Sequence, residues 1–130
     1  MSKRVTGIGG IFFKCSDPEK TKSWYNKHLG LDTNEYGSMF TWRDKDDKEK
    51  ICTTTWGTFK HDTSYFSPSE KDFMINYRVE NLEELLETLK SEGITQIGKT
   101  EVYDYGKFAW ILDCENNKIE LWEPIDDTFL

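Results

Sequence analysis

The pattern of apolar and polar positions predicts the same succession of elements twice along the chain. An apolar, β-prone stretch over residues 5–15 leads into a helical stretch that begins after Asp17 and ends at a glycine. A second apolar stretch over residues 73–79 leads into a helical stretch that begins after Asn81 and also ends at a glycine. Equivalent positions lie about 64 residues apart, so the sequence predicts a strand–helix unit used twice.

The two helices carry recognisable start and stop signals. Asp17 is a helix N-cap residue, and Pro18 occupies the first helical position, where its missing N–H costs nothing. Gly30 is a usual C-terminal stop. The second helix is the clearest amphipathic segment, with apolar residues at i, i+3, i+4 and i+7: Leu82, Leu85, Leu86 and Leu89.

The remaining strands are predicted from short β-prone runs bounded by turn residues. They cover residues 38–43 and 50–56 in the first half, and about 95–103, 107–113 and 117–123 in the second. In the first half a fourth strand is less evident. Either the connection over residues 57–71 contains it, or the preceding strand is long and bent.

This order of elements predicts an α+β fold built from two tandem βαβββ modules whose curled mixed sheets surround a cleft. The modules cover about residues 1–65 and 70–130, and together they form a single domain over residues 1–130.

Composition narrows the class of protein. Charged residues make up 32% of the chain, and no run of about 18 apolar residues or signal-peptide pattern occurs, so we expect a cytoplasmic protein without membrane contact. The net charge of −7 argues against nucleic-acid binding, which needs a basic face. Three cysteines without CxxC spacing argue against a disulfide framework and a zinc knuckle. Five Trp, six Tyr and eight Phe indicate, weakly, an aromatic-walled pocket.

Two motifs give the chain a family resemblance. The first runs from Asp17-Pro18-Glu19 through Trp24-Tyr25 to Leu29-Gly30-Leu31, and the second is the closing segment from Asp113 to Pro124, with its Ile-Glu-Leu-Trp-Glu-Pro ending. With these motifs, the internal repeat and its length, the sequence resembles the vicinal oxygen chelate superfamily, also called the glyoxalase/bleomycin resistance/dioxygenase family. The resemblance covers nearly the whole chain.

The resemblance implies a cleft that holds a divalent metal in many members, and it also implies a homodimer. The family's metal positions fall here on Gly10, on Met74, near Thr54 or Trp56, and on Glu120. Glycine has no ligand atom, and a thioether is a poor ligand for the ions concerned. One carboxylate does not hold a catalytic metal. We therefore expect no metal and no other cofactor.

Period-2 alternation predicts what else faces the cleft. Phe12, Lys14, Asn76 and Arg78 share a face with the two first-strand metal positions, and Lys118 and Trp122 share a face with Glu120. We expect Glu120 to be the catalytic residue if there is one, as a general base without metal. The ligand-binding residues are predicted to be Phe12, Trp56, Met74, Asn76, Arg78 and Trp122. Alternatively, Glu120 only satisfies the interior through an ion pair with Arg78 or Lys118.

Other reactive residues offer weaker candidates. His28 lies at the end of the first helix, where a structural role fits, and His61 lies in the connection between the halves. Cys114 has no histidine near it in sequence. The aromatic residues around the turn at 104–106 serve either as a lid over the cleft or as packing: Tyr103, Tyr105 and Trp110.

Three functions remain open at this point. The first is binding of a small organic ligand in an aromatic cleft without metal, as in bleomycin-resistance proteins, and this one we favour. The second is a metal-dependent lyase or dioxygenase of the vicinal oxygen chelate type. The third is an accessory role in which the cleft is filled by the protein's own aromatic side chains. The fold hosts many chemistries, so the resemblance alone does not choose among them.

Overall fold

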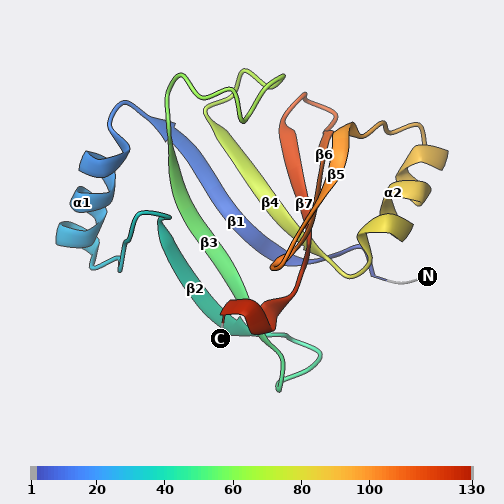
Figure 1. Cartoon of the computed structure of the whole chain (residues 1–130), viewed down its shortest axis with the longest axis horizontal. Helices are drawn as coiled ribbons and strands as arrows, with labels where there is room; N and C mark the ends of the chain where they lie inside the picture. The colour runs from blue at the N-terminus through green and yellow to red at the C-terminus, as the bar shows by residue number, and fades with distance from the viewer. Residues whose placement is uncertain (1–2, 130) are drawn as a thin grey trace.

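The computed structural model describes residues 3–129 and contains seven strands and two α-helices (Figure 1). The first half comprises β1 (Val5–Cys15), α1 (Pro18–Leu29), β2 (Ser38–Arg43) and β3 (Ile51–Lys60). The second half comprises β4 (Phe73–Val79), α2 (Leu82–Ser91), β5 (Ile97–Tyr103), β6 (Gly106–Leu112) and β7 (Lys118–Pro124). A short 3-10 helix, η1 (Asp126–Phe129), follows.

The two halves share their plan but differ by one strand. Three strands follow α2, as predicted, whereas only two follow α1, so the first module is βαββ rather than βαβββ. The segment between α1 and β2 forms no strand, only an isolated bridge between Asn34 and Gly37. β3 continues to Lys60, so the last strand of the first half is long, and the connection after it contains no strand.

All seven strands form one mixed sheet in the order β2-β3-β1-β4-β7-β6-β5. In each half the first strand pairs in parallel with the last, β1 with β3 and β4 with β7. The halves are joined by antiparallel pairing of β1 with β4. The two modules therefore pair within one chain, and their first strands lie at the centre of the sheet (Figure 1).

The helices begin as their sequences predict. Asp17 accepts a hydrogen bond from the Lys20 backbone N–H at 3.2 Å, and Asn81 accepts one from the Glu84 N–H at 3.1 Å. Gly30 follows α1 with φ 69°, a left-handed conformation that glycine adopts without strain. The first residues of both helices and the last residue of α1 are thus set by local sequence signals.

The two helices bury very different amounts of apolar surface. α2 packs Leu82, Leu85 and Leu89 onto β6 and β7, where they contact Ala109 and Leu121. By contrast, α1 leaves Trp24 and Leu29 exposed. The main core therefore lies under α2, in the second half.

Strand alternation separates the sheet into two faces. On the helix-bearing face, Trp56 packs against Tyr25 of α1, and Ile119 packs into the core under α2. Between the helices, which lie at opposite ends of the sheet in Figure 1, this face is open. Exposed apolar side chains occupy the gap on β1 and β4: Ile8 (39% exposed), Ile11 (46%) and Phe73 (41%). We call these three residues the apolar stripe.

Within the described part of the chain, no helix has the length and apolar character needed to cross a bilayer.

Candidate functional site

Four residues on four adjacent strands form one row across the other face of the sheet. Gly10 on β1 pairs with Thr55 on β3 and with Asn76 on β4, and Asn76 pairs with Glu120 on β7. The register between β1 and β4 shifts next to this row, between Ile8 and Gly10. The row thus contains one carboxylate, one amide, one hydroxyl and one position without a side chain.

A cleft of about 530 Å³ opens over this row. Its floor contains Gly9, Thr55, Asn76 and Glu120. Its walls are aromatic and come from both halves of the chain: Phe12, Tyr36, Tyr105, Phe108 and Trp122. The rings of Phe108 and Trp122 are stacked, with centroids 5.8 Å apart. This combination of apolar walls and few polar groups is typical of small-molecule sites.

Glu120 is buried at 3% exposure, and both of its oxygens accept hydrogen bonds from protein groups. Oε1 accepts from Asn76 Nδ2 at 2.7 Å. Oε2 accepts from the Tyr65 hydroxyl at 2.5 Å and from Trp110 Nε1 at 2.9 Å. A carboxylate has about four acceptor directions, so one remains, on Oε1.

Tyr65 reaches Glu120 from the connection between β3 and β4. Burial and the neighbouring Glu120 carboxylate raise the pKa of the Tyr65 phenol, so Tyr65 stays a hydrogen-bond donor. Lys118, two residues before Glu120, donates to the Tyr65 carbonyl at 2.7 Å and lies over the rings of Tyr65 and Trp110. Burial lowers the pKa of the Lys118 ammonium.

Arg78 lies two residues beyond Asn76 and is almost fully buried. Its guanidinium is stacked between the rings of Trp42 and Trp122, each centroid 5.4 Å away. It donates to Asp126 of η1 at 2.6 Å and to the Thr53 carbonyl at 3.2 Å. The ion pair of Arg78 is thus with Asp126 and not with Glu120.

The structure brings some of the predicted site residues together and separates others. Phe12, Asn76, Glu120 and Trp122 line the cleft, and Tyr105, one of the candidate lid residues, lies in its wall. Tyr103 stacks on Tyr105.

Three predicted ligand-binding residues lie outside the cleft: Trp56, Met74 and Arg78, whose guanidinium is paired with Asp126. Trp56 is on the helix-bearing face, where it contacts Tyr25, because Thr55 rather than its neighbours occupies the row. Met74 is completely buried in a cluster with Phe66 and Trp110. The direct partner of Glu120 on β4 is Asn76, another of the predicted site residues.

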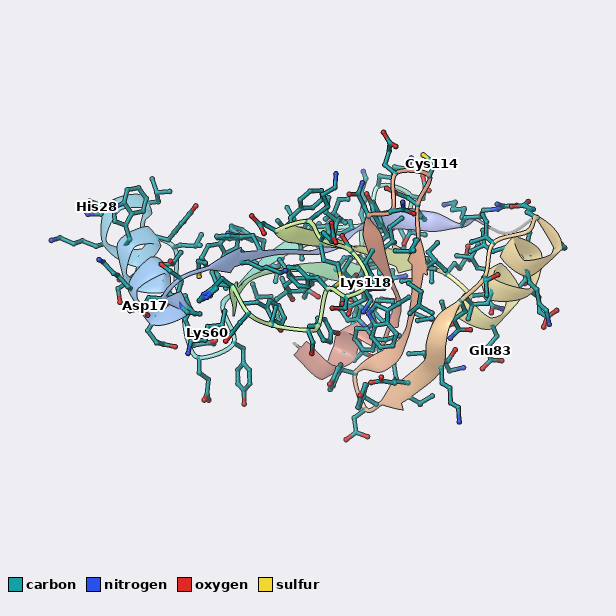
Figure 2. The ribbon with its side chains drawn as sticks, turned by 90° about the horizontal axis from the view of Figure 1, so that it is seen from above. Asp17, His28, Lys60, Glu83, Cys114 and Lys118 are labelled. Carbon is teal, nitrogen blue, oxygen red and sulfur yellow. The ribbon has the colours of Figure 1, made fainter. Side chains whose placement is uncertain are left out.

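Two other reactive candidates, His28 and Cys114, lie far from the cleft. Figure 2 shows Lys118 near the middle of the molecule, whereas His28 and Cys114 lie at its periphery. His28 contacts Trp24 on α1, and Cys114 is exposed in the turn before β7. Neither residue takes part in the site.

Sequence reasoning missed several residues of the site, Tyr65 above all. Tyr65 and Phe66 form an aromatic pair within a connection otherwise rich in Ser, Thr and charged residues, and this contrast was the available signal. Tyr36 and Phe108 gave no signal, because their contribution depends on how a loop and a hairpin fold over the sheet.

The residues at the row do not form a ligand set for a divalent ion. Among residues 3–129, no three His, Cys, Asp or Glu side chains gather in a way that could hold a metal. The row contributes one carboxylate, and a typical catalytic site needs three protein ligands. A metal at Glu120 would also compete with the donors from Asn76, Tyr65 and Trp110.

No protein-family model and no curated protein matches the sequence. In contrast, 64 chains of solved structures match the fold. Methylmalonyl-CoA epimerase from Mycobacterium tuberculosis is similar at 15% identity and a TM-score of 0.64, over 98% of this chain and 94% of that one. A Streptomyces coelicolor methylmalonyl-CoA epimerase variant in complex with 2-nitronate-propionyl-CoA is similar at 13% identity and a TM-score of 0.70, over 93% and 96%.

A glyoxalase/bleomycin resistance protein/dioxygenase superfamily member from Vibrio splendidus is similar at 11% identity and a TM-score of 0.55, over 89% of this chain and 97% of that one. At such low identities these likenesses concern the fold alone. They confirm the vicinal oxygen chelate, or glyoxalase-like, fold that the sequence resemblance predicted.

Proposed function

We propose that this protein binds a small organic molecule in its aromatic cleft and does so without a catalytic metal. The observation that supports the proposal best is the state of Glu120. Its carboxylate is the only ionised group in the row across the described strands, and three protein donors already engage it. By accepting these hydrogen bonds, the carboxylate holds the side chains of Asn76, Tyr65 and Trp110 in place around the cleft floor.

The size and lining of the cleft favour a ligand over a collapsed interior. A volume of about 530 Å³ lies within the usual range of about 300–1,000 Å³ for small-molecule sites. The aromatic walls do not fill this space, which argues against a purely accessory role. The metal-dependent lyase or dioxygenase remains the alternative, since one structural neighbour is a glyoxalase/bleomycin resistance protein/dioxygenase superfamily member.

Native mass spectrometry of protein purified without chelator or affinity metal tests the proposal first. We expect no stoichiometric divalent ion, either as purified or after incubation with zinc, manganese or cobalt salts. A bound ion at one per subunit that Glu120→Gln removes would overturn the metal-free proposal and support the alternative.

A thermal-shift screen of small aromatic compounds tests ligand binding itself, because a ligand specific to the folded state raises the unfolding temperature. Tyr36→Ala removes an exposed ring from the cleft wall without disturbing the Glu120 hydrogen bonds. Trp24→Ala removes another exposed aromatic ring, on α1 and outside the cleft. Hits should weaken in the first variant and persist in the second; hits unaffected by Tyr36→Ala would place binding elsewhere.

We further propose that the protein is a homodimer that covers the apolar stripe of Ile8, Ile11 and Phe73. These side chains lie side by side on β1 and β4, between the two helices, and remain 39–46% exposed in the monomer. Contiguous exposed apolar surface of this kind marks interaction sites. Ile11→Lys should convert the dimer to a monomer in light-scattering measurements, whereas Val102→Lys, at an exposed site on the edge strand β5, should not. A monomeric wild-type protein would rule the dimer out.

A further inference from the structure

The described residues that line the cleft present acceptors and aromatic faces but no cation. Glu120 is their one charged side chain, and neither lysine, arginine nor histidine is among them. Two cations lie on the same strands but are engaged elsewhere: Arg78 with Asp126, and Lys118 with the Tyr65 carbonyl. A carboxylate or phosphate entering the cleft would lose its hydration without gaining a counter-ion.

Asn76 contributes a buried hydrogen-bond acceptor without a donor at the cleft floor. Its amide nitrogen donates to Glu120, which fixes the amide so that Oδ1 points away from that carboxylate. Oδ1 is buried and has no hydrogen-bond partner. Buried acceptors of this kind are rarely left unpaired, so this atom requires a donor that the described protein does not supply. Oδ1 lies above Gly9, where a Cβ would approach it to 2.1 Å.

We infer that the ligand is a cationic amine carried on a flat apolar frame. This inference rests on the proposed ligand-binding function and specifies the chemical class of the ligand. The ammonium N–H groups would donate to Asn76 Oδ1 and to the remaining acceptor direction of Glu120 Oε1. The faces of the aromatic walls attract the cation and stack on the frame.

The test compares three probes that share one frame and differ in the end group: tryptamine, tryptophol and indole-3-propionate. Isothermal titration calorimetry at neutral pH measures each dissociation constant. Tryptamine should bind at least about tenfold more tightly than indole-3-propionate and several-fold more tightly than the neutral tryptophol. The preference should persist at about 0.5 M salt, because a buried site is screened far less than the surface.

Two variants then test where the preference arises. Tyr36→Ala should reduce the ratio of tryptamine to tryptophol affinity, since the ring attracts the cation, and Trp24→Ala should leave the ratio unchanged. Asn76→Ser, checked for folding by circular dichroism, should lower tryptamine affinity more than tryptophol affinity.

Three outcomes would overturn the inference: equal or tighter binding of indole-3-propionate, loss of the amine preference in salt, or an unchanged ratio in both cleft variants. The second outcome would assign the preference to the net charge of −7 and not to the cleft. In each of these cases the proposed function survives provided that a probe still binds and that Tyr36→Ala weakens its binding. Failure of all three probes, together with a screen that yields no hit sensitive to Tyr36→Ala, would overturn both.

Discussion

Asn76 and Glu120 are direct partners in the parallel register of β4 and β7, and the Asn76 amide donates to Glu120 Oε1 at 2.7 Å. Each residue belongs to a different part of the second module, and the sheet register alone brings them together. Their contact lies at the floor of the cleft and fixes the orientation of the Asn76 amide.

Glu120→Gln tests how far this floor depends on a carboxylate. The amide nitrogen of glutamine is a donor and would face at least one of the three existing donors, from Asn76, Tyr65 or Trp110. We expect the free energy of unfolding in urea to fall by about 1–3 kcal/mol. Glu87→Gln, at an exposed site on α2, should change it by less than about 0.5 kcal/mol. Equal effects of the two substitutions would contradict this account of the floor.

Tyr65→Phe tests the phenol that donates to Glu120 through the pH dependence of stability. Burial and Glu120 raise the Tyr65 pKa above its ordinary value of 10.0. Below pH 10 the phenol is protonated in both states, and its contribution is complete. Above pH 10 the unfolded chain releases the proton while the folded chain retains it, so the free energy of unfolding falls as pH rises.

Denaturant unfolding between pH 9 and 11.5 measures this effect. The wild type should lose stability faster than Tyr65→Phe, by at most about 1.4 kcal/mol per pH unit. Because the Tyr65 residue is 39% exposed, solvent screening should reduce the difference below that limit. Parallel curves for the two proteins would show that Tyr65 titrates normally.

Gly9→Ala tests the close approach of β1 to Asn76. The added methyl group would lie 2.1 Å from Asn76 Oδ1 and 2.9 Å from the Trp122 ring, so both would have to move. We expect a loss of about 1–3 kcal/mol in the free energy of unfolding. Gly10→Ala meets mainly the far edge of the Phe12 ring, which can rotate, and should cost less. The reverse order of the two losses would refute this assignment.

Asp126→Ala tests the ion pair between Asp126 and the buried Arg78. Removing the carboxylate leaves the buried Arg78 guanidinium without its counter-charge, a change that typically costs about 3–5 kcal/mol. Asp127→Ala removes the neighbouring exposed carboxylate and should cost less than about 0.5 kcal/mol. Thermal unfolding of the two variants side by side measures the difference. A loss below about 1 kcal/mol for Asp126→Ala would indicate that solvent already reaches Arg78.

Much of the fold could be predicted because its signals are local. The caps at Asp17 and Asn81, the leucine periodicity of α2 and the turn residues fix most elements to within a few residues. The missing strand in the first module was harder to recognise. Repeat symmetry suggested a fourth strand, either within residues 57–71 or as part of a long preceding strand, and the structure shows the long strand β3 and no strand in that connection.

The site was predicted only in part, because its residues depend on register and on loops. Alternation correctly grouped Asn76, Glu120 and Trp122, which lie on paired strands. The family resemblance put the matching position of the first module near Thr54 or Trp56, whereas Thr55 pairs with Gly10, and an error of one residue in alignment reverses the face of a strand. Tyr65 comes from a connection, for which strand alternation makes no prediction.

The unequal burial of the two helices has a consequence for how the molecule moves. Opening α1 exposes little apolar surface, whereas opening α2 exposes three buried leucines. Backbone amides of α1 should therefore exchange with deuterium much sooner than those of α2. Tyr36, which follows α1, belongs to this more pliant half, while Glu120 belongs to the stiff half. A ligand bound between these two residues would slow amide exchange mainly in the first module. Part of its binding free energy would then offset the entropic cost of ordering that module.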